Sequence, residues 1–125
     1  AVGTHDFKPA CYSYAKGGIN SWQFNQNYVK NRKNDFGSEV VIISLGSNDH
    51  EGVKTYNELY KLRERIKAQR VYWILSNPEK FPKQANDVKL IAISFGDFVI
   101  ETKRYQADKV HPSWAGYKEL ADQAI

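Results

Sequence analysis

This chain of 125 residues contains no methionine, a single cysteine and only four prolines. One cysteine excludes a disulfide within the chain, and we expect Cys11 to be a buried, unreactive side chain. No apolar run approaches the ~20 residues of a membrane-spanning helix, and no segment has the pattern of a secretory signal peptide. The spacing of His, Cys and Asp residues fits no metal site. We therefore expect no membrane span, no metal and no cofactor.

The charge of the chain is mild, with a formal net charge of +4 at pH 7. Its basic residues are scattered, and we expect them to lie on solvent-exposed faces of the protein. No nucleic-acid-binding motif accompanies them. We therefore expect no nucleic-acid partner. Aromatic residues make up 14% of the chain, which leaves contact with a glycan open.

Short apolar runs alternate with amphipathic stretches along the sequence. The run from Val40 to Leu45 is almost continuously apolar and mostly β-branched, which is typical of a strand buried on both faces of a parallel sheet. We predict strands at 11–15, 40–45, 71–75 and 98–100. We predict helices at 20–33, 53–69, 83–95 and 112–125. This alternation predicts one domain, residues 1–125, with a three-layer α/β/α sandwich around a parallel sheet.

Three polar or glycine-rich segments follow predicted strands. They are Gly17-Gly18, the segment from Gly46 to Asp49, and the segment from Asp108 to His111. Because parallel sheets bind ligands beyond the carboxyl ends of their strands, we expect these segments to meet at one edge. Simple strand-ending turns would explain the glycines, but not the gathering of Asn, Asp and His side chains.

The spacing of Asp108 and His111 suits an acid–base pair. A carboxylate three residues before an imidazole can hold one tautomer and stabilise the charged form, as a proton-transferring histidine requires. The alternative is that His111 only caps a helix that begins near Pro112.

Three segments resemble the conserved blocks of the SGNH (GDSL-type) hydrolase family, in family order. Residues 41–49 (VIISLGSND) are similar to the third block, an apolar strand followed by Gly-x-Asn-Asp. Residues 108–112 (DKVHP) are similar to the fifth block, Asp-x-x-His-Pro, and residues 14–22 (YAKGGINSW) to the second. The resemblance implies the flavodoxin-like fold of that family and spans nearly all of the chain.

The resemblance also implies roles for particular residues. His111 would act as general base and then as general acid, and Asp108 would orient it. The Asn48 side-chain amide and the backbone N–H of Gly18 would form the oxyanion hole, with Gly17 as the alternative to Gly18 in that turn. Such donors can approach a tetrahedral oxygen closely.

Two residues that follow Asn48 have no expected part in the reaction. We expect Asp49 to tie down its own loop. His50 has no counterpart in the family motif, and we expect it at the surface, with a place on the cleft wall as the alternative.

The family's nucleophile is missing from this chain. No Gly-Asp-Ser occurs, and we expect none of the serines present to replace it. In the family the first strand, which ends in Gly-Asp-Ser, lies between the second and third strands. We therefore expect a segment that precedes Ala1, in the same chain or as a separate peptide, to complete the sheet and supply the serine.

The function implied is that of a serine esterase that hydrolyses O-acyl esters, with a carbohydrate ester or another small-molecule ester as substrate. Trp22, Trp73, Trp114 and Tyr117 would suit a sugar-lined cleft, and they would equally suit the core. One alternative is a non-catalytic SGNH-like module that has lost its nucleophile and binds a glycan or a protein. Another is a different three-layer α/β domain in which the motifs are coincidental.

Overall fold

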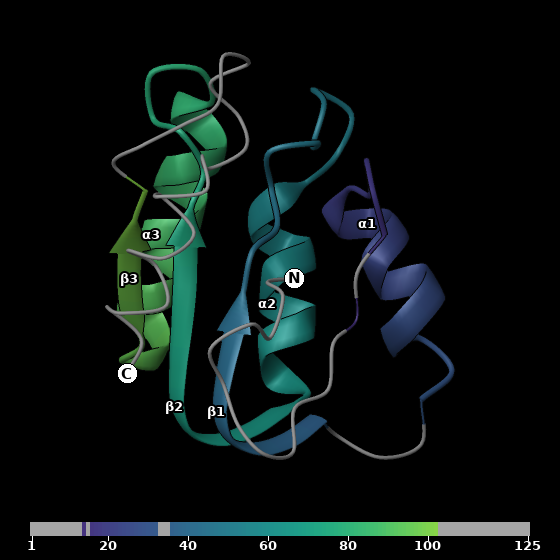
Figure 1. Cartoon of the computed structure of the whole chain (residues 1–125). Coiled ribbons are helices and arrows are strands. Elements are labelled where there is room, and N and C mark those ends of the chain that lie inside the picture. The colour runs from purple at the N-terminus through teal and green to yellow at the C-terminus, as the bar shows by residue number, and fades with distance from the viewer. Residues whose placement is uncertain (1–13, 15, 33–35, 103–125) are drawn as a thin grey trace.

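The computed structural model of the chain describes Tyr14, residues 16–32 and residues 36–102, in which strands and helices alternate (Figure 1). The strands are β1 (Phe36–Ile43), β2 (Ile66–Leu75) and β3 (Phe98–Glu101). The helices are α1 (Ser21–Phe24), its π-helical continuation η1 (Asn25–Val29), α2 (Thr55–Glu64) and α3 (Pro82–Phe95). The predicted α/β class with a parallel sheet is confirmed for this part of the chain.

The sheet has the strand order β1-β2-β3, and both pairings are parallel. The register of β1 with β2 runs from Phe36 opposite Ile66 to Ile43 opposite Trp73. All three strands therefore point the same way, and their carboxyl ends lie at one edge of the sheet, the upper edge in Figure 1. Helices α2 and α3 lie side by side against one face of the sheet (Figure 1).

Strand β2 is buried on both of its faces. Val71, Trp73 and Leu75 pack into the main core together with α2 and α3. On the other face Ile74 forms a second apolar cluster with Ile100 of β3. Burial on both faces explains why this strand reads as a continuous apolar run, since each fully buried aliphatic side chain contributes about 1.5–3 kcal/mol.

Helix α3 agrees closely with the prediction at 83–95. Its inward positions Val88, Ile91 and Ala92 are all at most 1% exposed. The helix begins with Pro82 at its first position, and the residue that follows its end is Gly96, which has a φ of +70°. Proline at the start and a left-handed glycine at the end are the expected boundaries of a helix.

The predicted helix at 53–69 is wrong in its last third. Helix α2 ends at Glu64, and β2 starts at Ile66, five residues before the predicted strand. Residues 66–70 pair with the first half of β1, from Phe36 onward. Ile66 is buried as a strand residue, and its apolar side chain also fits the helical spacing of the segment before it. Spacing therefore could not separate helix from strand here, and pairing with a distant strand decided the outcome.

Two further boundaries differ from prediction. β1 spans residues 36–43 rather than 40–45, and the helix predicted at 20–33 ends at Val29. Tyr14 lies outside any regular element, although it falls in the strand predicted at 11–15. The rest of that strand and the helix predicted at 112–125 lie outside the described residues.

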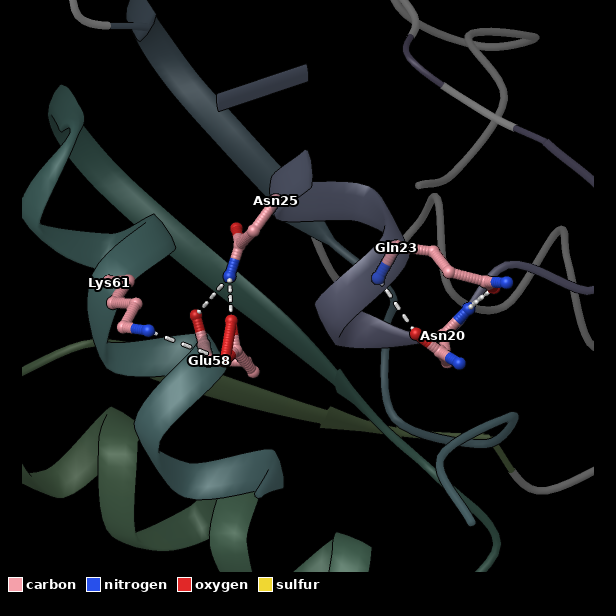
Figure 2. A network of polar contacts seen from close by, with 5 residues as sticks. All are labelled: Asn20, Gln23, Asn25, Glu58 and Lys61. Atoms are coloured by element: carbon pink, nitrogen blue, oxygen red, sulfur yellow. Dashed lines mark hydrogen bonds and ion pairs between the residues drawn. The ribbon is translucent and has the colours of Figure 1, made fainter. Parts of the chain in front are cut away.

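Two sets of side-chain hydrogen bonds hold α1 and η1 in place, as Figure 2 shows. Asn20 caps the helix in a reciprocal capping box with Gln23, which satisfies two backbone N–H groups. The buried Asn25 amide then donates to the backbone oxygen of Glu58 at 2.8 Å and to its Oε1 at 3.0 Å. These bonds fix the short helix against α2.

A buried ion pair joins the end of α2 to the turn between α3 and β3. The Arg63 guanidinium donates to Asp97 through Nε at 2.7 Å and through Nη2 at 3.0 Å. Asp97 Oδ2 also accepts a hydrogen bond from the indole Nε1 of Trp73 at 2.9 Å. Because the two charged side chains are only 14% and 5% exposed, this contact is part of the core rather than a surface salt bridge.

Candidate functional site at the carboxyl edge of the sheet

Polar side chains are buried where the strands end. The buried residues that follow β1, β2 and β3 in this way are Asp49, Ser76, Asn77 and Thr102. The start of α1 lies beside the β1–α2 loop at the same edge (Figure 1). Because buried polar groups must be hydrogen-bonded, these loops have a defined geometry rather than a loose solvent-facing course.

The loop after β1 opens with a glycine that no other residue would replace easily. Gly46 has a φ of +117°. A Cβ at this position would lie 3.4 Å from Ser76 Oγ and 3.7 Å from Gln84 Cβ. The N–H of Asp49 donates back to the Gly46 carbonyl at 3.0 Å and closes the turn that presents Asn48.

Asn48 contacts the segment that follows the Gly17-Gly18 turn. Its Nδ2 donates to the carbonyl oxygen of Ile19 at 3.2 Å, while the residue itself is exposed. Gly18 immediately precedes Ile19, is exposed, and has a φ of +73°. A primary amide has two N–H groups, so the bond to Ile19 leaves a second donor on an exposed side chain. The structure thus brings together two of the three segments that were predicted to meet.

Asp49 is tied to its loop, as expected, and also to three helices. The residue is 4% exposed. Its Oδ1 accepts from the backbone N–H of Ser21 at 2.7 Å, and its Oδ2 accepts from Thr55 Oγ1 at 2.7 Å. Its backbone carbonyl accepts from Gln84 Nε2 at 2.7 Å. Sequence reasoning missed Thr55 and Gln84, because neither lies in a strand-end segment.

His50 is exposed, in agreement with the expectation of a surface position. Its Nδ1 accepts the backbone N–H of Gly52 at 3.1 Å, which fixes the imidazole within its own turn.

The remaining predicted site residues divide into two groups. Gly17 is exposed, and a Cβ there would meet no atom within 4 Å. Asp108 and His111 lie outside the described residues, as do Trp114 and Tyr117. The structure therefore places the Gly18 and Asn48 segments together, and the position of the acid–base pair remains a prediction.

The two tryptophans within the described residues have different environments. Trp73 is 1% exposed and belongs to the core, so it is not available to a ligand. Trp22 is 51% exposed and lies on α1, next to Ser21, whose N–H is bonded to Asp49. Only Trp22 of this pair can contact a substrate.

Residues 14, 16–32 and 36–102 contain no group of three or more His, Cys, Asp or Glu side chains that could hold a metal ion. Among the helices described, none is both long enough and apolar enough to cross a membrane. No protein-family model, curated protein or solved structure matches this chain.

Proposed function

We propose that this protein is a serine esterase of the SGNH type that hydrolyses O-acyl esters. The observation that carries the proposal is the contact of Asn48 with Ile19, directly after Gly18, at the carboxyl edge of a parallel sheet. That contact puts a side-chain amide beside a turn with an exposed glycine. An oxyanion hole requires two N–H donors close together, and in this proposal the Gly18 N–H is the second donor beside the Asn48 amide.

In the proposed reaction a serine oxygen attacks the ester carbonyl, and His111 takes the serine proton. The carbonyl oxygen becomes an oxyanion, which accepts hydrogen bonds from the Asn48 amide and the Gly18 N–H. His111 then gives the proton to the leaving alcohol, and an acyl-enzyme remains. Water, activated by the same imidazole, releases the acid and restores the serine. Asp108 orients His111 throughout.

The serine would come from a first strand that pairs with β1. Within the described residues β1 has a strand neighbour on its β2 side alone. Its Val40, Val41 and Ile42 side chains are β-branched and half-buried on both faces, which favours an internal strand. In the flavodoxin-like order 2-1-3-4-5, the strands β1, β2 and β3 would correspond to the third, fourth and fifth. A parallel strand added beside β1 would end close to Asn48.

A carbohydrate ester is the substrate class we favour. Trp22 is a large aromatic side chain, half exposed to solvent, on the helix that starts at the proposed oxyanion hole. An exposed indole of this kind can stack on the apolar face of a sugar ring.

The test uses the intact protein, with mass spectrometry to establish whether a Gly-Asp-Ser segment precedes Ala1 or accompanies the chain. Hydrolysis of p-nitrophenyl acetate is measured for the unmodified protein and for the variants Asn48→Ala and His111→Ala. We expect the loss of Asn48 to lower kcat by about 10²–10³-fold, as for other oxyanion donors. Asn57→Ala is the matched control, because Asn57 is an exposed amide on α2, and it should leave kcat unchanged.

Two results would refute parts of the proposal. Inactivity in a sample proven to contain Gly-Asp-Ser would exclude the esterase and favour a binding module. Full activity from a lone 14.4 kDa species would show that no further segment supplies the nucleophile.

A further inference from the structure

Asp49 uses every polar group it has to hold a different part of the fold. Its N–H bonds to Gly46 in its own turn, and its carbonyl oxygen accepts from Gln84 of α3. One carboxylate oxygen bonds to Ser21 at the start of α1, and the other bonds to Thr55 at the start of α2. The residue next to Asn48 is therefore the point where three helices and one loop are joined.

Asn48 and Asp49 together clamp one short segment. Asn48 donates to the carbonyl of Ile19, and Asp49 accepts from the N–H of Ser21. Two bonds from adjacent residues to positions 19 and 21 restrict both the distance and the rotation between the two segments. Gly18 immediately precedes the clamped stretch, so its N–H is held relative to the Asn48 amide.

The burial and hydrogen bonding of the Asp49 carboxylate favour a specific structural role for this residue. A carboxylate that is 4% exposed costs free energy to bury, and within the described residues no cation pairs with Asp49. Its charge is instead stabilised by two short bonds of 2.7 Å, which are the charge-assisted type. Thr55 is the first residue of α2, where the positive end of the helix dipole also favours an anion.

We propose that Asp49 is the positioning residue of the oxyanion hole: it sets the separation between the Asn48 amide and the Gly18 N–H without touching substrate. This inference rests on the proposed esterase function. The reacting oxygen needs both donors at hydrogen-bond distance at once, and a displacement of about 1 Å can cost ~10²-fold in rate. The bond from Asn48 to Ile19 and the bond from Asp49 to Ser21 together supply that accuracy.

The test compares Asp49→Ala with Asp49→Asn in the intact protein. Alanine loses both side-chain bonds, whereas asparagine can accept from Ser21 N–H and donate to the Thr55 hydroxyl oxygen. We expect Asp49→Ala to lower kcat by about 10–100-fold with KM changed less than ~3-fold, and Asp49→Asn to restore kcat to within ~5-fold. Asp87→Ala is the matched control, because Asp87 pairs with Lys83 of the same helix, α3.

Hydrogen exchange gives a second readout that does not depend on activity. In Asp49→Ala the Ser21 amide should exchange at least ~10-fold faster, while the amide of Val88 in the core stays protected. If Asp49→Ala does not fold, Thr55→Val removes a single bond and should give a smaller fall in kcat and faster Ser21 exchange.

Either of two results would overturn the inference: a folded Asp49→Ala variant with unchanged kcat, or an Asp49→Asn variant as impaired as alanine. If the unmodified protein itself has no esterase activity, the proposed function fails and the catalytic role of Asp49 fails with it. The exchange of Ser21 would still show whether Asp49 holds the two segments together.

Discussion

Replacing Asp97 with alanine should lower the free energy of unfolding by about 4 kcal/mol. The carboxylate makes two bonds to Arg63 and a third to the Trp73 indole, and its side chain is 5% exposed. Removing one partner of a buried ion pair typically costs ~3–5 kcal/mol, and an unsatisfied buried indole N–H costs at least ~1 kcal/mol more. Arg63 keeps part of its stabilisation, because it still donates to the Ile66 carbonyl and lies over the Phe95 ring. We therefore take the lower end of the range for the pair.

The measurement is urea unfolding followed by far-ultraviolet circular dichroism. A loss of about 4 kcal/mol is a large share of the ~5–15 kcal/mol that stabilises a typical domain, and it should lower Tm by about 15 °C. Asp97→Asn can still accept from Trp73 and from one Arg63 nitrogen, so its loss should be about half as large. Asp87→Ala, which breaks an i,i+4 pair with the 70% exposed side chain of Lys83, should change the free energy by less than about 0.5 kcal/mol. Equal losses for Asp97→Ala and Asp87→Ala would refute the reasoning, because they would show that burial of the pair contributes nothing.

Further predictions concern the loop after β1, the surface of α1 and its attachment. Gly46→Ala places a side chain at a φ of +117° and should cost about 1–3 kcal/mol in urea unfolding, whereas Gly17→Ala, in open space, should be neutral. Trp22→Ala should leave Tm within about 2 °C and abolish quenching of tryptophan fluorescence by acetylated oligosaccharides; unchanged quenching would refute the sugar contact. Asn25→Ala loses both bonds to Glu58 and should cost about 2 kcal/mol, with native stability as the contradicting result.

Local sequence patterns were sufficient to predict an element whose signals all lie within its own segment. Helix α3 carries its apolar positions at helical spacing, with proline at its start and a left-handed glycine after its end, and all of these signals lie within the segment itself. The apolar runs of β1 and β2 likewise predicted buried parallel strands, because burial on both faces requires apolar side chains at consecutive positions.

The candidate site was predicted in part for the same reason. Strand ends can be read from the sequence, and the carboxyl ends of parallel strands share an edge, so the approach of Asn48 to the Gly18 turn could be expected. The pairing of Thr55 and Gln84 with Asp49 could not, because these contacts depend on how α2 and α3 dock on the sheet. Nor could the spacing tell that Trp22 is exposed and Trp73 buried, since both lie in apolar stretches.

The sequence by itself determined the alternation of strands and helices, the parallel arrangement and the segments at the strand ends. Each follows from periodicity and turn chemistry over a few neighbouring residues. Only the tertiary structure decided that α2 stops at Glu64 and that β2 begins at Ile66, because residues 66–70 gain hydrogen bonds from a strand about thirty residues earlier. Only the tertiary structure showed that Asp49 joins several elements. Its partner Ser21 is 28 residues away in the sequence, and no local pattern predicts a hydrogen bond over that separation.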